Sequence, residues 1–151
     1  MSNIKLNSIF KTVCIASDHA GFILKEDIKN FLINKKISIF DIGPYNNDQS
    51  VDYPDYAKKL GNRIKQKKSD VGILVCGSGT GMAISANKIK TIRAAVCYNL
   101  KSTRLSRQHN NANIIALGSR LIKKKLSMKL VEVFLRTKFE GGRHLRRVKK
   151  I

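Results

Sequence analysis

The chain has 151 residues and a mass of 17.0 kDa, which is the size of a single domain with one hydrophobic core. Hydrophobic residues make up 42% and charged residues 26%, which excludes a wholly disordered chain, and no apolar run is long enough to cross a membrane. The 30 lysines and arginines exceed the 10 aspartates and glutamates, and the resulting net charge of +20 favours phosphorylated or polyanionic partners.

The first half of the chain alternates short apolar runs with amphipathic segments. Residues 12–17 are apolar and β-branched, which predicts a strand buried on both faces. A helix is predicted over residues 21–34, because apolar side chains recur there at helical spacing. A second strand is predicted over residues 37–42, and a second helix over residues 54–67 with proline in its first turn.

The second half continues this alternation. The clearest strand is predicted over residues 71–76 (VGILVC), and a glycine-rich turn ends it. The remaining predicted elements are a helix over 82–88, a strand over 92–97, a helix over 101–108, a strand over 113–117 and a helix over 121–138. Alternating strands and helices predict a single Rossmann-like α/β domain of three layers, in which helices cover both faces of a five-stranded parallel sheet.

Cysteine spacing and acidic residues limit the kinds of site the chain can form. The three cysteines lie far apart, which favours reduced thiols, and Cys14 and Cys97 are expected to be small buried apolar residues. No CxxC or HExxH spacing indicates zinc, and no acidic residue lies between Asp70 and Glu132. The start of the chain lacks the apolar core of a secretory signal, so a cytoplasmic location is the default expectation.

A glycine-rich loop follows the third predicted strand, at the edge of the sheet where sites in parallel α/β proteins gather. The loop Gly77–Gly81 resembles an anion cradle, because glycines let backbone N–H groups approach a ligand at a helix N-terminus. The spacing fits neither a Walker loop nor a dinucleotide-binding fingerprint. A tight turn without any ligand is the alternative interpretation of this loop taken alone.

Three other positions carry reactive or charged groups. Cys76 lies at the mouth of the loop, where a helix N-terminus would favour its thiolate; the alternative is a buried cysteine without chemistry. His109 is a candidate for acid–base work near neutral pH or for a capping role. Arg143 and Arg147 would share one face of a helix and suit a phosphate, or would belong to a solvated basic tail.

Seven segments along the chain are far more specific together than any one alone. They are Ser17–Gly21, Asp52–Asp55, Cys76–Gly81, Ala86–Lys88, Ser106–Asn110, Gly118–Arg120 and Gly141–His144. In this order the chain resembles the ribose-5-phosphate isomerases of type B, in the family that also holds galactose- and allose-6-phosphate isomerases. The resemblance covers about residues 12–148, so residues 1–11 are expected to be an N-terminal extension and residues 12–151 the isomerase domain.

The resemblance implies an aldose–ketose isomerase that interconverts ribose 5-phosphate and ribulose 5-phosphate without a metal or cofactor, in the non-oxidative pentose phosphate pathway. It implies that Cys76 moves a proton between C2 and C1 through an enediolate. It also implies that Ser78 assists proton transfer at O1, while the loop backbone holds the developing oxyanion. His109 would open the sugar ring with help from Asp18.

The resemblance further implies how the substrate is held. The implied binding residues are Asp18, His19, Tyr53, Gly77, Ser78, Gly79, Thr80, Gly81, Asn110, Arg120, Arg143 and Arg147. The family builds each site from two subunits, which implies a homodimer or a dimer of dimers in which the His109 region and the arginines face the Cys76 loop of the other chain. A small sugar phosphate is therefore the expected partner, and neither a specific nucleic acid nor a membrane is expected.

Two alternatives stay open. An isomerase of a six-carbon sugar phosphate, such as allose or galactose 6-phosphate, would need a longer pocket. A basic nucleic-acid-binding protein would account for the net charge, but aromatic residues make up only 7% of the chain and no helix-turn-helix or RNA-binding signature occurs.

Overall fold

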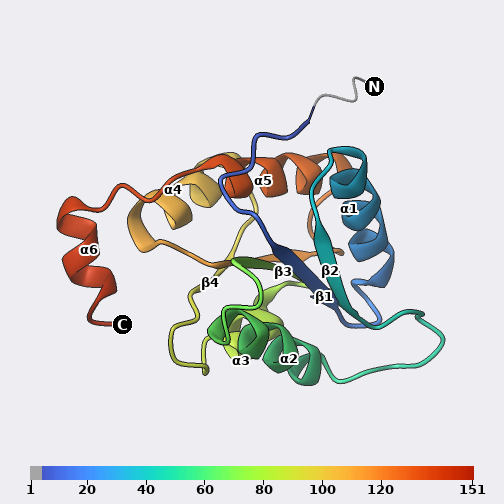
Figure 1. The fold of residues 1–151 in the computed structure, drawn as a ribbon. Coiled ribbons are helices and arrows are strands. Elements are labelled where there is room, and N and C mark those ends of the chain that lie inside the picture. The colour runs from blue at the N-terminus through green and yellow to red at the C-terminus, as the bar shows by residue number, and fades with distance from the viewer. Residues whose placement is uncertain (1–4) are drawn as a thin grey trace.

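The computed structural model describes residues 5–151, which form one twisted parallel sheet between two layers of helices (Figure 1). The sheet order is β2-β1-β3-β5-β4. The strands are β1 (Val13–Ser17), β2 (Ile39–Gly43), β3 (Val71–Cys76), β4 (Ala94–Val96) and β5 (Ile114–Gly118). The helices are α1 (Phe22–Asn34), α2 (Tyr53–Lys65), α3 (Thr80–Ala86), α4 (Leu100–Asn110), α5 (Lys124–Arg136) and α6 (Gly142–Val148).

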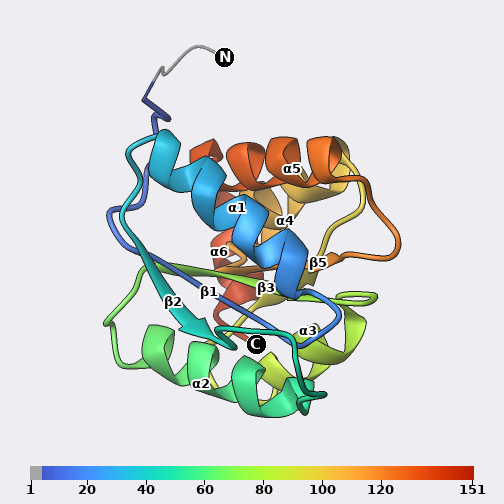
Figure 2. The same ribbon diagram turned by 90° about the vertical axis from the view of Figure 1, so that its right-hand side faces the viewer.

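Two apolar cores lie on opposite faces of the sheet, as the alternation of side chains along each strand requires. In β1, Val13 and Ile15 belong to the core beneath α1 and α5, whereas Cys14 and Ala16 belong to the core beneath α2 and α3. Figure 2 shows these two helix layers on either side of the strands. The predicted three-layer α/β fold with a five-stranded parallel sheet is therefore confirmed.

A buried ion-pair cluster joins α1 to the edge strand β2. The Lys25 side chain is completely buried, and its Nζ lies 2.8 Å from Oε1 of Glu26 and 2.8 Å from Oδ2 of Asp41. Lys29 also lies 2.8 Å from Asp41. Because a buried ammonium group is costly without partners, these carboxylates fix the position of α1 on the sheet.

The predicted elements are all present, but several boundaries differ for local reasons. The predicted strand over 92–97 is shortened to β4, because the chain turns at Thr91 (φ 81°) and the N–H of Ile92 is bonded to Ile89. Helix α5 begins at Lys124 rather than residue 121, since the N–H groups of Leu121 and Ile122 both donate to the carbonyl of Gly118. Helix α6 is an additional element at the C-terminus.

Part of the predicted N-terminal extension can be described. Residues 1–4 of it lie outside the described residues. Over residues 5–11, the N–H of Leu6 donates to the carbonyl of Lys35 and the N–H of Ile9 donates to the carbonyl of Leu135. This segment therefore lies against the ends of α1 and α5. No helix within residues 5–151 is both long and apolar enough to span a membrane.

Candidate active site

The carboxyl edge of the sheet brings together three of the segments identified in the sequence. Ser17 of β1 pairs with Val75 of β3, and Cys76 pairs with Gly118 of β5. The residues that follow these strands therefore emerge side by side, as expected for parallel strands.

Cys76 lies beneath the glycine loop and is 4% exposed. Its Sγ accepts a hydrogen bond from the backbone N–H of Gly79 at 3.1 Å. Gly79 has φ +80° and is the residue from which α3 begins, a conformation that glycine adopts without strain. A donor aimed at the sulfur stabilises the thiolate, so this sulfur is suited to act as a base.

Contacts with neighbouring parts of the chain hold the glycine loop in place. The N–H of Ser119 donates to the carbonyl of Cys76 at 2.8 Å, and Oη of Tyr98 donates to the carbonyl of Ser78 at 3.2 Å. A Cβ atom on Gly118 would lie only 2.7 Å from that same Ser78 oxygen, so only glycine permits this approach. These contacts fix the loop backbone before any substrate arrives, which favours a preorganised oxyanion site.

Arg120 and Tyr53 flank the loop within the same chain. The N–H of Arg120 donates to the carbonyl of Gly77, and its Nη1 lies 3.0 Å from the position that a Cβ on Gly77 would occupy. The Tyr53 ring lies 2.8 Å from the corresponding Cβ position of Gly81. Arg120 departs from the expectation that the arginines face the loop of the other chain, because it directly follows β5, the neighbour of β3.

Asp18 and His19 lie at the next strand end. Asp18 is 7% exposed, and its Oδ1 accepts the N–H of Gly21 at 2.8 Å, which orients the carboxylate at the start of α1. Nδ1 of His19 accepts the N–H of Val51 at 3.2 Å. This contact assigns the proton of a neutral His19 to Nε2, which leaves Nε2 as a donor for an oxygen of the ligand.

A second group forms around His109, at the end of α4. The His109 and His144 rings stack with centroids 4.2 Å apart and planes 8° apart. Oε2 of Glu140 lies 3.9 Å from Nε2 of His109 and 3.6 Å from Nε2 of His144. Desolvation lowers the pKa of His144, and the neighbouring positive charges of His109 and Arg143 lower it further.

Glu140 and His144 were not identified as site residues from the sequence. Their spacing of four residues and the three histidines of the chain were available as signals, but nothing in the sequence indicated that α6 would return to α4. The three side chains could contact a metal ion, since their ligand atoms lie within 4.8 Å of one another. Parallel rings do not aim their nitrogen lone pairs at a common point, however, so this arrangement fits a cation poorly.

The two groups lie at opposite edges of the sheet. His109 is the second-last residue of α4, and β5 begins five residues later at Ile114. Cys76 pairs with Gly118 at the other end of that strand, roughly 13 Å further along. Arg143 and Arg147 lie on α6 beside His144, at the far left of Figure 1. One chain therefore does not bring His109, Asn110 and this arginine pair to its own Cys76 loop.

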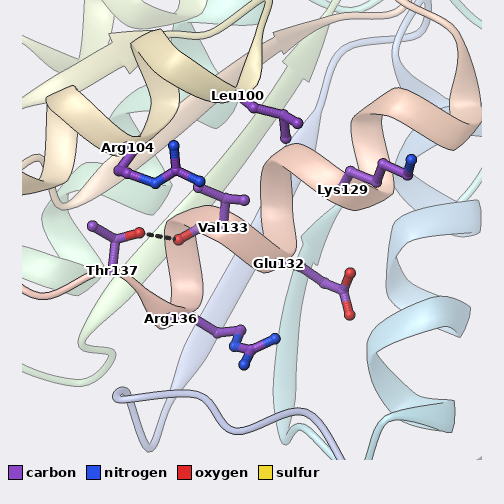
Figure 3. Close-up of a pocket in the computed structure, with 7 residues that line it drawn as sticks. All are labelled: Leu100, Arg104, Lys129, Glu132, Val133, Arg136 and Thr137. Atoms are coloured by element: carbon purple, nitrogen blue, oxygen red, sulfur yellow. Dashed lines mark hydrogen bonds between the residues drawn. The ribbon is translucent and has the colours of Figure 1, made fainter.

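The other cysteines and a surface hollow lie outside these groups. Burial raises the pKa of Cys14 to about 11 and also raises the pKa of Cys97, as expected for thiols without chemistry. Figure 3 shows a hollow between α4 and α5, where Arg104 and Glu132 are among the lining residues and the Thr137 hydroxyl donates to the Val133 carbonyl. None of the predicted site residues lines this hollow.

Comparison with known protein families adds to this geometry. The family model described as Ribose/Galactose Isomerase matches residues 13–151. The chain belongs to this family. The resemblance inferred from the seven sequence segments is thereby confirmed.

Individual members of the ribose/galactose isomerase family match along almost the whole chain. The ribose-5-phosphate isomerase B of Escherichia coli K12 is 40% identical over 141 residues, covering 93% of this chain and 94% of the relative. The solved structure of a ribose 5-phosphate isomerase of type B from Thermotoga maritima has 52% identity and a TM-score of 0.90, covering 92% of this chain and 95% of that one. The type B enzyme of Mycoplasma genitalium, solved with bound ribulose-5-phosphate, has 42% identity and a TM-score of 0.89, with 92% of each chain covered.

Proposed function

We propose that the protein is a ribose-5-phosphate isomerase that interconverts ribose 5-phosphate and ribulose 5-phosphate in the non-oxidative pentose phosphate pathway. The observation that carries this proposal is the Cys76 sulfur, which accepts the N–H of Gly79 beneath a fixed glycine loop. The ribulose-5-phosphate bound by the Mycoplasma genitalium relative supports the choice of substrate. No metal or cofactor takes part in the proposed reaction.

In the proposed mechanism the Cys76 thiolate removes the proton from C2 of the open-chain aldose. The electron pair of that C–H bond forms the C1–C2 double bond of an enediolate, and the negative charge moves to the oxygen on C1. Backbone N–H groups of Gly77–Gly81 stabilise this oxyanion, and the Ser78 hydroxyl assists proton transfer at O1. The hydroxyl proton on O2 passes to O1, which leaves the negative charge on O2. As the proton returns from sulfur to C1, the C1–C2 double bond breaks and C2–O2 becomes the carbonyl of the ketose, so atoms and electrons balance without an oxidant.

Substrate binding in this proposal uses both groups of residues. His109 opens the furanose ring, assisted by Asp18, and Asn110 contacts the sugar. His19 and Arg120 beside the loop, together with Arg143 and Arg147 on α6, hold the phosphate; Tyr53 borders the sugar. Because the phosphate lies far from the reacting carbons, its binding energy can align C1 and C2 with the sulfur.

A second copy of the chain completes each site in this proposal. His109 and Cys76 lie at opposite edges of one sheet, so they meet only across an interface between two chains. We therefore propose a homodimer, or a dimer of dimers, with two shared sites per pair. The three unpaired cysteines are in keeping with a cytoplasmic location. Neither a specific nucleic acid nor a membrane is proposed as a partner.

Comparing turnover of three sugar phosphates by the wild-type protein and Cys76→Ala tests this function. Ribose 5-phosphate is expected to be isomerised faster than allose 6-phosphate and galactose 6-phosphate, and Cys76→Ala is expected to reduce turnover by about 10²–10⁴ because the base is lost. Cys14→Ala is the matched control, since its thiol is buried in the core. Faster turnover of a six-carbon substrate would establish the alternative isomerase, and unchanged activity of Cys76→Ala would contradict the role of the sulfur.

A further inference from the structure

The N-terminal segment (residues 5–11) lies before the family match, which begins at residue 13, yet it is built into the fold. Leu6 is 4% exposed and belongs to the core beneath α1 and α5. The N–H of Ile9 donates to the carbonyl of Leu135 at 3.0 Å, and the Phe10 side chain packs against the same core. The segment is therefore anchored at three points along its length.

Phe10 contacts a buried cation. Arg107 is 3% exposed, and no carboxylate in residues 5–151 forms an ion pair with it. Its Cζ lies 4.8 Å from the centroid of the Phe10 ring and 5.6 Å from that of Phe134. The negative face of an aromatic ring attracts a guanidinium group, and this attraction is larger when the cation is withdrawn from water. Phe10 thus supplies part of the stabilisation that a carboxylate would otherwise provide.

The other side of Arg107 joins two parts of the chain. Its Nε donates to the carbonyl of Thr137 at 3.1 Å, just past the end of α5. Its Nη1 donates to Oδ1 of Asn111 and to the carbonyl of Ala112, just past the end of α4. These bonds tie the end of α4 to the start of the connection that leads to α6.

A second hydrogen-bonded link joins the same two parts of the chain. The N–H of Glu140 donates to the carbonyl of Gln108 at 3.0 Å. Together, the hydrogen bonds of Arg107 and of the Glu140 N–H set the position of α6 relative to α4. His109 lies on α4, whereas Arg143 and His144 lie on α6. The same hydrogen bonds therefore set the distance between the His109 imidazole and the arginine pair of α6.

We propose that the N-terminal segment, through the Phe10 ring on Arg107, positions His109 relative to the arginine pair of α6. Phe10 and Arg107 are positioning residues in this proposal, and neither contacts the substrate. The proposal rests on the proposed function only for its catalytic consequence, because the stacking of His109 on His144 can be observed without turnover.

Two substitutions of Phe10 separate the ring contact from simple packing. Phe10→Leu keeps an apolar side chain but removes the aromatic face, whereas Phe10→Tyr keeps that face. Phe31→Leu is the matched control, since Phe31 packs against the same core from α1. Each variant is assayed for kcat and KM with ribose 5-phosphate and for the imidazole ¹H–¹³C NMR signals of the three histidines.

Phe10→Leu is expected to lower kcat/KM by about tenfold, mainly through a higher KM, because the arginine pair no longer holds the phosphate at a fixed distance from His109. The signals of His109 and His144 are expected to shift as their stacking loosens, while the His19 signal stays unchanged. Phe10→Tyr and Phe31→Leu are expected to retain the wild-type KM and signals.

Two results would overturn the proposal. Wild-type KM and wild-type His109 and His144 signals in Phe10→Leu would show that the segment positions nothing. Equal losses in Phe10→Leu and Phe10→Tyr would show that the ring–guanidinium contact is not what transmits the effect. If no variant, including the wild type, isomerises ribose 5-phosphate, the proposed function fails, and the NMR signals still decide the positioning role.

Discussion

The three cysteines differ in what surrounds each sulfur. Burial raises the pKa of Cys14 to about 11, although Ser69 and Arg63 partly oppose this, and its Sγ donates to the carbonyl of Val71. Burial also raises the pKa of Cys97. Cys76 instead receives the N–H of Gly79. The Cys76 sulfur therefore faces a backbone N–H of the glycine loop at the start of α3.

Iodoacetamide at pH 8 is expected to modify Cys76 at least about tenfold faster than the other two thiols, because alkylation requires the thiolate. A thiol with a pKa near 11 is ionised to only about one part in a thousand at this pH. Peptide mass spectrometry over a time course measures the three rates separately. Cys76→Ser is the control and is expected to show no fast phase. A fast phase at Cys14 or Cys97 would contradict this view of the three sulfurs.

At this scale the sequence predicted the residues that follow strands better than those brought together by helices. Cys76 was identified because it ends a predicted strand, whereas Asp18 and Arg120 were implied by the family resemblance. All three follow or end parallel strands, which deliver their ends to one edge of the sheet. Glu140 and His144 were missed because their approach to His109 depends on α6 packing near α4. That approach is fixed by bonds from a buried arginine to backbone carbonyls, which leave no periodic pattern in the sequence.

The contact between α1 and β2 depends on charge as well as on apolar packing. Hydrogen bonds from Lys25 and Lys29 lower the pKa of Asp41 below 3.8, even though burial acts in the opposite direction. The same two lysines lower the pKa of Glu26 below 4.5, again against its desolvation. The unfolded chain therefore binds more protons than the folded one at acidic pH, and stability increases with pH in that range.

The contribution of this cluster to the free energy of unfolding is expected to be constant above about pH 5 and to decrease as pH falls through the lowered pKa values of Asp41 and Glu26. Asp41→Asn is expected to flatten this decrease. It is also expected to destabilise the protein by about 3 kcal/mol at pH 7, because buried Lys25 loses a partner. Urea unfolding between pH 3 and pH 7 measures both effects. Asp48→Asn, at an exposed position in the loop before α2, is the control. If the free energy of unfolding of Asp41→Asn decreased as steeply at acidic pH as that of the wild type, Asp41 would not be the source of the decrease.

Elements with strong apolar periodicity were predicted well, and those fixed by tertiary contacts were not. The buried strand β3 has the bounds predicted from its apolar run. The edge strand β4 is shorter than predicted, because the bonds of Ile92 turn back locally instead of joining the sheet. Helix α6 carries three arginines and one histidine in seven positions (GRHLRRV), and its Leu145 is 42% exposed. It therefore offers no apolar stripe that would identify it.

At the scale of the whole molecule, the two candidate groups, around Cys76 and around His109, lie at opposite ends of the strands. A chain lacking Cys76 keeps an intact His109 group, and a chain lacking His109 keeps an intact Cys76 group. If each site is shared between two chains, as proposed, a mixed pair of such chains holds one complete site and one site that lacks both residues.

Refolding an equal mixture of Cys76→Ala and His109→Ala chains together is expected to restore about a quarter of wild-type activity, because half of the random pairs carry one intact site of two. Each variant alone is expected to stay nearly inactive. The measurement is isomerisation of ribose 5-phosphate, with native mass spectrometry to count mixed pairs.

Cys76→Ala mixed with the double variant Cys76→Ala/His109→Ala is the control, since no pair in that mixture has a complete site. Mixed pairs that form in the expected proportion without any recovery of activity would contradict the shared site. Recovery in the control mixture would show that activity does not require Cys76.

The opposite placement of His109 and Cys76 also bears on how reaction velocity scales in very dilute assays. If each centre is shared between two copies, as proposed, it is lost when they separate. Below the dissociation constant of such a pair, the velocity is then expected to grow with the square of the protein concentration. In that proposed pair, a substrate bound by both copies favours their association and lowers the protein concentration at which the loss occurs. Under the same proposal, the sugar phosphate itself would stabilise the contact between the two copies.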